Sequence, residues 1–157
     1  MLRLSKKTDY ALLALGHLAG EGALGVASAR AIAERFNIPL ELLAKILQQL
    51  ARHGLIAAHQ GVHGGYSLVR PAHAISVADV AHVIDGPMTL TACSLTDDRC
   101  DQFATCTVRD PLWLIGQRIL SVLETVTIAD LGSDDGQRVP MMLRKPDFAA
   151  EFPLVIR

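Results

Sequence analysis

The sequence predicts a mainly α-helical fold with a small β-hairpin, arranged as a winged helix-turn-helix followed by a long C-terminal helix. Two short segments with helical periodicity flank the turn Asn37-Ile38-Pro39, a pattern typical of a helix-turn-helix. Directly afterwards, a glycine-rich loop from Gln60 to Gly65 separates two short strand-like segments, which indicates a hairpin. Asp110-Pro111 then predicts the start of a longer helix, with Asp as N-cap and Pro in the first helical position.

The first two helices are predicted from their caps and their apolar spacing. One runs over residues 6–20, where leucines recur at helical intervals and Ser5 is placed to cap the helix. The other runs from about residue 28 to residue 36. Its N-cap is Ser28, because a serine oxygen accepts a hydrogen bond from an unpaired N–H of the first turn.

The third helix is predicted from Pro39 to about His53. Proline suits a first helical position because its φ is already helical and its missing N–H would have no partner there. Gly54 follows and is expected to end the helix. The strand-like segments are residues 55–59 and 66–69, so the hairpin is expected to form a wing beside this helix.

Beyond the wing, the sequence predicts a short helix over residues 76–84, with Ser76 as cap and Asp79 as the acid three residues later. The long helix after Asp110 has a wide apolar stripe, which we interpret as a dimer interface. A further capped turn is expected over residues 127–131. The predicted stripe consists of Leu112, Ile115, Ile119, Val122, Leu123 and Val126, widened by Leu114 and Leu120.

These patterns predict three parts of the chain. Residues 1–72 form the winged helix-turn-helix domain, residues 73–131 hold a cysteine loop and the dimerisation helix, and residues 132–157 form a C-terminal tail. The sequence contains no apolar run near twenty residues and no signal peptide core at its N-terminus. We therefore expect a cytoplasmic protein with no membrane association and with reduced thiols.

The charge distribution favours double-stranded DNA as a partner. Residues 1–70 carry eight Lys and Arg against four Asp and Glu, whereas the remainder carries seven against twelve, giving the net charge of −1. On the third helix, we expect Glu41, Ala44, Lys45 and Gln48 to face base edges in the major groove. The positions expected at phosphates or, for the wing, in the minor groove are Lys6, Lys7, Arg30, Arg52, Gln60 and His63. Individually, such side chains are also ordinary solvated residues, and the prediction rests on their combination.

Three cysteines, Cys93, Cys100 and Cys106, lie in one loop without helical periodicity. Zinc sites usually contain closer cysteine pairs and four nitrogen or sulfur ligands. Three thiolates in a flexible loop are instead compatible with an iron–sulfur cluster of the 2Fe–2S or 4Fe–4S type. Its fourth ligand would come from another part of the chain.

The sequence resembles the Rrf family of winged-helix regulators, which includes the IscR and NsrR types and the regulator of the SUF cluster-assembly operon. Within residues 1–131, the stretch around Cys93 is most similar to the SUF-regulator branch. The matching segments are residues 4–6, 8–12, 33–34, 38–39, LARHGLI at 50–56, GVHGGY at 61–66, 75–80, the cysteine loop and VTIADL at 126–131.

The resemblance implies a homodimer with one iron–sulfur cluster per subunit, held by the three cysteines. Arg109 stands where the IscR type has a ligand histidine, whereas Asp9 stands where the NsrR type has an aspartate donated by the partner. Alternatively, Asp9 is an acid stabilised by the helix dipole. Gln60 replaces an arginine common in the family's wing. If Asp9 does bind the cluster, a hard carboxylate is the weakest of the four ligands, and its release would alter DNA affinity.

We hypothesise a repressor of SUF-type iron–sulfur assembly genes that binds DNA when the cluster is present. A nitric oxide or redox sensor with the same cluster is an alternative, as is a cluster-free regulator that senses oxidants through its thiols. From another class, a zinc-stabilised interaction module remains open. An enzyme is not expected, because the chain lacks a nucleophile elbow, a P-loop and a dinucleotide-binding GxGxxG.

Overall fold

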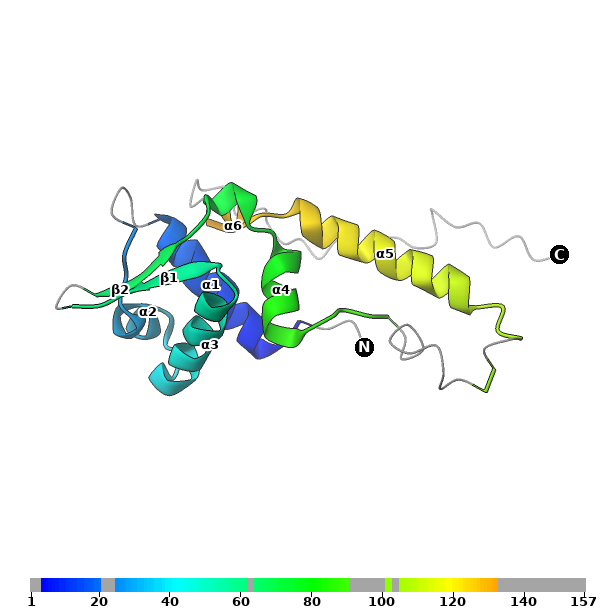
Figure 1. The fold of residues 1–157 in the computed structure, drawn as a ribbon, viewed down its shortest axis with the longest axis horizontal. Helices are drawn as coiled ribbons and strands as arrows, with labels where there is room; N and C mark the ends of the chain where they lie inside the picture. Colours follow the sequence, from blue (N-terminus) through cyan, green and yellow to red (C-terminus); the bar gives the residue numbers. More distant parts are fainter. Residues whose placement is uncertain (1–3, 21–24, 62–63, 91–100, 103–104, 133–157) are drawn as a thin grey trace.

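The structure is a computed structural model that describes residues 4–20, 25–61, 64–90, 101–102 and 105–132. Figure 1 shows helices α1 to α4 and the hairpin packed together, with α5 projecting away from them. The elements in chain order are α1 (Lys6–Gly20), α2 (Ala29–Phe36), α3 (Leu40–Arg52), β1 (Ile56–His59), β2 (Gly65–Leu68), a short 3-10 helix (Ala72–Ala74), α4 (Val77–Asp85), α5 (Arg109–Thr125) and α6 (Ile128–Gly132).

The helix-turn-helix of α2 and α3 is confirmed, with one shift in position. The Ser28 hydroxyl accepts a hydrogen bond from the Ala31 N–H at 3.1 Å, as expected of the N-cap of α2. Asn37 ends this helix in the left-handed conformation, with φ 52°. Pro39 is the N-cap of α3 rather than its first helical residue, because its ψ of 122° is extended.

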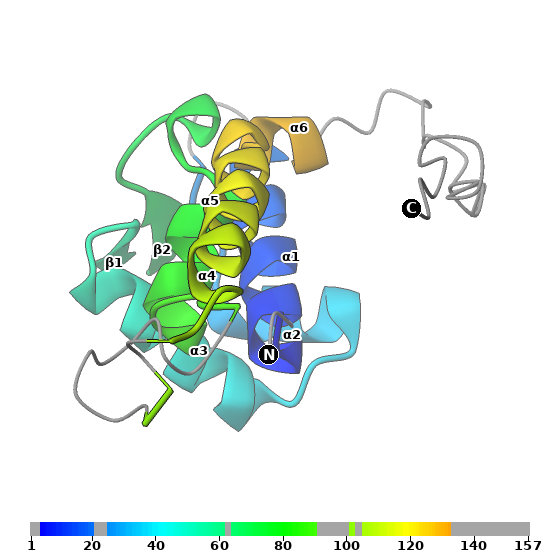
Figure 2. The same ribbon diagram turned by 90° about the vertical axis from the view of Figure 1, so that its right-hand side faces the viewer.

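One hydrophobic core joins the helices and the hairpin. The inner face of α3 is buried along its whole length, as its apolar periodicity predicts. Figure 2 shows α5 in front of α4, and the described core residues come mainly from α1, α2, α3, the hairpin and α4 rather than from α5. The largest fully buried apolar side chains are Leu15, Ile32, Leu43, Ile46, Leu47, Leu50, Ile56, Ile75, Val80 and Ile128.

The wing is a two-stranded antiparallel hairpin in which Ile56 pairs with Leu68 and His59 with Gly65. A third segment, which the sequence did not reveal, joins it at Ala27. The Ala27 N–H donates to the Tyr66 carbonyl at 3.0 Å, and the Tyr66 N–H donates to the Ala27 carbonyl at 2.9 Å. The hairpin is therefore anchored to the segment that leads into α2.

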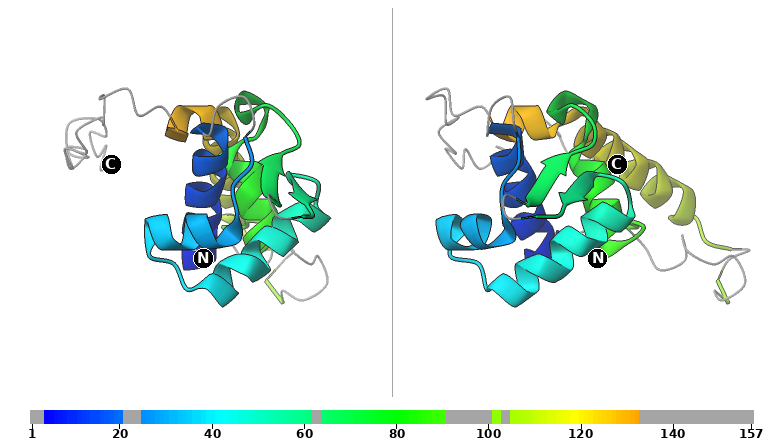
Figure 3. Two further views of the ribbon diagram at one scale, coloured as in Figure 1. Left: turned by 90° about the vertical axis from the view of Figure 1, so that its left-hand side faces the viewer. Right: turned by 60° about the vertical axis from the view of Figure 1, so that its left-hand side comes forward.

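The chain after α5 returns to the winged helix-turn-helix. The predicted capping box at the start of α4 is present, since the Asp79 N–H donates to the Ser76 hydroxyl and the Ser76 N–H donates to the Asp79 carboxylate. The Val77 N–H also donates to the Val126 carbonyl at 2.8 Å. Beyond it, α6 packs against α1 and fully buries Ile128 (Figure 3). These contacts fix the C-terminal end of α5 relative to α1.

The predicted start of α5 is wrong by two residues. The N-cap is Val108, without a side-chain cap, and the helix begins at Arg109. Asp110 lies in the first turn, where its carboxylate accepts a hydrogen bond from the Arg109 Nε at 2.8 Å. Pro111 is tolerated there because first-turn N–H groups have no intrahelical partner. None of the helices in the described ranges combines the length and apolarity needed to cross a membrane.

Candidate nucleic-acid interface and cysteine loop

The predicted base-contacting residues lie together on the outer face of α3. Glu41, Lys45 and Gln48 are exposed and follow one another at helical spacing, opposite the buried face. Ala44 is half-buried, so its contribution to this face is a small apolar surface. Figure 1 shows α3, α2 and the hairpin at the end of the molecule opposite the projecting α5. This leaves the outer face of α3 open to a large partner such as a DNA groove.

The residues predicted at phosphates come from three helices, and those predicted for the minor groove come from the wing. Lys6 and Lys7 are exposed in the first turn of α1, and Arg30 is exposed in the first turn of α2. Arg52 is exposed at the end of α3, and Gln60 is exposed after β1. Their charges and hydrogen-bond donors face solvent, as backbone contacts to DNA require. His63 lies outside the described residues.

Asp85, the last residue of α4, belongs to a cap that the sequence did not reveal. Its Oδ2 accepts hydrogen bonds from the Ser5 N–H at 3.0 Å and from the Thr8 hydroxyl at 2.7 Å. The Ser5 hydroxyl in turn accepts from the Thr8 N–H, and Thr8 is fully buried. The N-terminus of α1 therefore has a capping box whose acid comes from another helix.

This cap lowers the pKa of Asp85. Burial raises the pKa, but the hydrogen bonds from Ser5 and Thr8 and the charge of Lys7 outweigh burial, so the pKa lies below its ordinary value. A depressed carboxylate pKa stabilises the fold above the unfolded-state pKa, about 3.9. That stabilisation is lost as the pH falls through the folded-state pKa.

Asp85→Ala should therefore lower the free energy of unfolding at pH 7 by about 1 kcal/mol, the usual cost of losing a helix cap. At a pH below the folded-state pKa of Asp85, the difference from wild type should shrink, because the carboxyl is then protonated in the folded as well as the unfolded state. Urea unfolding followed by circular dichroism at both pH values measures this. An equal difference at both pH values would show that the carboxylate charge does not stabilise α1.

The structure describes only part of the predicted ligand set. Cys106 is half-buried, whereas Cys93 and Cys100 lie outside the described residues. Asp9 is exposed on the first turn of α1, and in the described ranges no hydrogen bond or ion pair reaches its carboxylate. Arg109, at the position of the IscR-type histidine, donates to Asp110.

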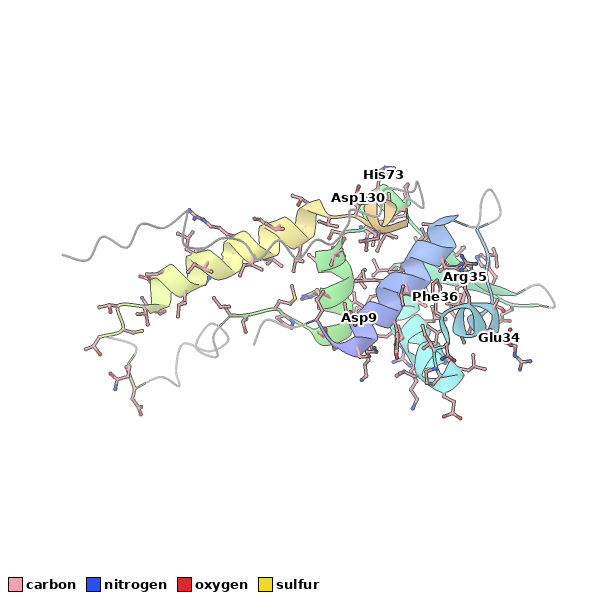
Figure 4. All side chains as sticks on the ribbon, turned by 180° about the vertical axis from the view of Figure 1, so that it is seen from behind. Asp9, Glu34, Arg35, Phe36, His73 and Asp130 are labelled. Carbon is pink, nitrogen blue, oxygen red and sulfur yellow. The ribbon has the colours of Figure 1, made fainter. Side chains whose placement is uncertain are left out.

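Asp9 and the start of α5 lie in different parts of the protomer. Figure 4 shows Asp9 beside the C-terminal end of α4, while the N-terminal end of α5, which closely follows Cys106, projects to the far end of the molecule. One protomer therefore does not bring the Asp9 carboxylate to the segment that carries Cys106.

Comparison with known proteins agrees with this architecture. A Mycobacterium tuberculosis protein named as a helix-turn-helix-type transcriptional regulator is 34% identical over 130 residues, 83% of this chain and 81% of its own. The structure of CymR, the global cysteine regulator of B. subtilis, has a TM-score of 0.70 and 27% identity, covering 85% of this chain and 98% of CymR. T. potens IscR has a TM-score of 0.66 and 27% identity, covering 89% and 92%.

The winged helix-turn-helix and the exposed face of α3 have the architecture of a transcriptional regulator, and the M. tuberculosis protein and CymR are named as regulators rather than enzymes. Residues 4–134 match the profile of the Rrf2 family, described as iron-dependent transcriptional regulators. The predicted membership of this family and the predicted fold class are thus confirmed, whereas the similarity to the SUF-regulator branch stays a prediction. This chain is a helix-turn-helix-type transcriptional regulator and belongs to the Rrf2 family.

Proposed function

We propose that this regulator is a homodimeric repressor that binds a double-stranded DNA operator and senses iron–sulfur cluster status. Its targets are SUF-type cluster-assembly genes, and it acts in the cytoplasm, where these genes are transcribed. The observation that carries the proposal is the combination of three cysteines within residues 93–106 with an exposed carboxylate at Asp9, to which no hydrogen bond or ion pair runs within the described part of the chain. The family's description as iron-dependent supports this combination.

DNA binding is proposed for the outer face of α3 and for the wing. Lysine and glutamine on this face have donors that match guanine and adenine edges, whereas a glutamate accepts from cytosine. The cations of α1 and α2 would neutralise phosphates and set the position of α3 without selecting a sequence. The resulting expectation is that Lys45 and Gln48 determine operator sequence, while Lys7 and Arg30 determine salt dependence.

Dimerisation is proposed through α5, because this helix buries none of its residues within the protomer. Ile115 and Val122 are 46% and 61% exposed, and their seven-residue spacing puts them on one helix face. A second copy of α5 would remove this apolar surface from water. Since α6 fixes the end of α5 against α1, the dimer would hold its two α3 helices at a defined spacing for two half-sites.

The donor set of this chain fits an iron–sulfur cluster. Cysteine thiolates are the usual cluster ligands, and a carboxylate such as Asp9 can complete the set. Asp9 is apart from the Cys106 segment within one protomer, so donation from the partner's α1 in the dimer is the arrangement that would unite them. When bound, the cluster supplies a redox- and iron-sensitive link between subunits. Through Asp9, α1 would be held in place by the bound group, and α3, which packs against α1, would thereby stay in the DNA-binding position.

Anaerobic purification tests this proposal directly. We expect a coloured protein with stoichiometric iron and acid-labile sulfide. Cys93→Ala or Cys106→Ala should abolish the visible absorption, because each removes a ligand. Asp9→Ala should keep the dimer but change the spectrum and weaken DNA binding. A protein that stays colourless after reconstitution with iron and sulfide would contradict cluster sensing, and an unchanged Asp9→Ala variant would remove Asp9 from the ligand set.

A cluster-free thiol sensor is the second candidate. It is favoured by one similar structure, the oxidised form of Staphylococcus aureus CymR, with a TM-score of 0.65 and 26% identity over 84% of this chain and 97% of that one. In this case, the purified protein would lack iron. Its DNA affinity would change when its cysteines are oxidised, and a thiol reductant would restore that affinity.

A further inference from the structure

The last turn of α4 is bonded to the DNA-facing helix as well as to α1. The Gln49 Nε2 on α3 donates a hydrogen bond of 2.7 Å to the Val83 carbonyl of α4. That carbonyl is among the last four of its helix and has no intrahelical partner, so the Gln49 side chain supplies the missing donor. Two residues later, Asp85 binds the N-terminus of α1. This turn therefore contacts both helices.

Gln49 lies at the edge of the face of α3 that carries the predicted DNA contacts, four residues after Lys45, and its amide nitrogen bonds to α4. It is half-buried, whereas its neighbour Gln48 is exposed. On the other side of the bond, Val83 lies three residues before Gly86, where a φ of 84° ends α4 and the chain leaves toward the cysteine segment. One part-buried hydrogen bond thus connects α3 to the base of that segment.

We propose that Gln49 is a positioning residue that transmits the state of the cysteine loop to α3. This inference rests on the proposed function, in which α3 binds DNA and the cysteines sense the signal. A shift of the last turn of α4 would move its Val83 carbonyl, and the hydrogen bond makes α3 follow. DNA affinity then depends on the state of the loop even though Gln49 does not contact DNA, a coupling that requires two arrangements of α3.

The test compares two states of the cysteines in the full-length protein. Affinity for a duplex selected from a random-sequence pool is measured by fluorescence anisotropy, once with reduced thiols and once after complete alkylation with N-ethylmaleimide. In wild type, we expect the two affinities to differ by about 5-fold or more. Gln49→Met keeps the side-chain length but removes the donor, and should bring this ratio below about 2-fold. Gln49→Glu places a carboxylate oxygen against the Val83 carbonyl oxygen, so that two hydrogen-bond acceptors face each other, and it should lower the ratio in the same way.

Gln48→Met is the matched control, because it makes the same substitution one residue earlier on the exposed face. It should weaken DNA binding by the same factor in both thiol states and leave the ratio unchanged. Hydrogen exchange of residues 40–52 without DNA gives a second readout. Alkylation should alter protection in wild type and Gln48→Met but not in Gln49→Met.

The possible failures are distinguishable. The coupling between the cysteines and α3 would be overturned if wild type bound DNA equally well in both thiol states and its hydrogen exchange did not change on alkylation. It would also be overturned if the Gln49 variants fold and keep the wild-type ratio of the two affinities. A protein that binds no iron or sulfide but keeps the alkylation effect would overturn cluster sensing and leave the role of Gln49 standing. Circular dichroism of each variant verifies that it is folded.

Discussion

Gly65→Ala should destabilise the protein and weaken DNA binding, whereas Gly16→Ala should stabilise it. A Cβ on Gly65 would lie 2.6 Å from the Ala27 carbonyl oxygen and 2.8 Å from its carbon, both backbone atoms. The hairpin and the segment before α2 would have to separate, which breaks the paired hydrogen bonds between Ala27 and Tyr66. Such overpacking costs about 1–3 kcal/mol, and backbone contacts place this site at the upper end of that range.

Gly16 provides the matched control within α1. A Cβ there meets nothing within 4 Å, so alanine adds no steric conflict. Because glycine in a helix interior costs about 0.5–1 kcal/mol relative to alanine, Gly16→Ala should raise the free energy of unfolding by that amount. Urea unfolding of both variants, with DNA titration of each, measures the contrast. Equal stability of Gly65→Ala and wild type would show that the wing is not held tightly against Ala27.

Val122→Glu should dissociate the proposed dimer and lower operator affinity by about 100-fold or more, because a single protomer loses the gain in effective concentration from the second half-site. The side chain is 61% exposed in the protomer, so the charge should not disturb the protomer fold. In the dimer, the same carboxylate would be taken out of water without a partner, which opposes association. Sedimentation velocity and DNA titration measure the two effects.

The control for Val122 is Gln117→Glu, which adds the same charge to an exposed residue on another face of α5. It should sediment as the wild-type dimer and bind the operator with similar affinity. Unchanged sedimentation of Val122→Glu would exclude this face of α5 as the interface. A monomeric wild-type protein would exclude dimerisation altogether.

Most helix boundaries could be predicted because their determinants are local. The Ser28 cap and the Ser76–Asp79 capping box each involve residues three apart, so sequence spacing reveals them. The outer face of α3 likewise follows from helical periodicity. The start of α5 could not be predicted from Asp110-Pro111, because this pair is compatible with both the cap and the first turn of a helix.

The sequence by itself determined the winged helix-turn-helix, the family and the side chains of the outer face of α3, since periodicity, caps and motifs are properties of neighbouring residues. Only the tertiary structure decided how the parts are connected. The Asp85 carboxylate accepts hydrogen bonds from Thr8 and Ser5, which are 77 and 80 positions away in the sequence, and Gln49 donates a hydrogen bond to a carbonyl 34 positions away. Such bonds leave no spacing pattern, because their partners meet only after the apolar faces of α1, α3 and α4 have packed into one core.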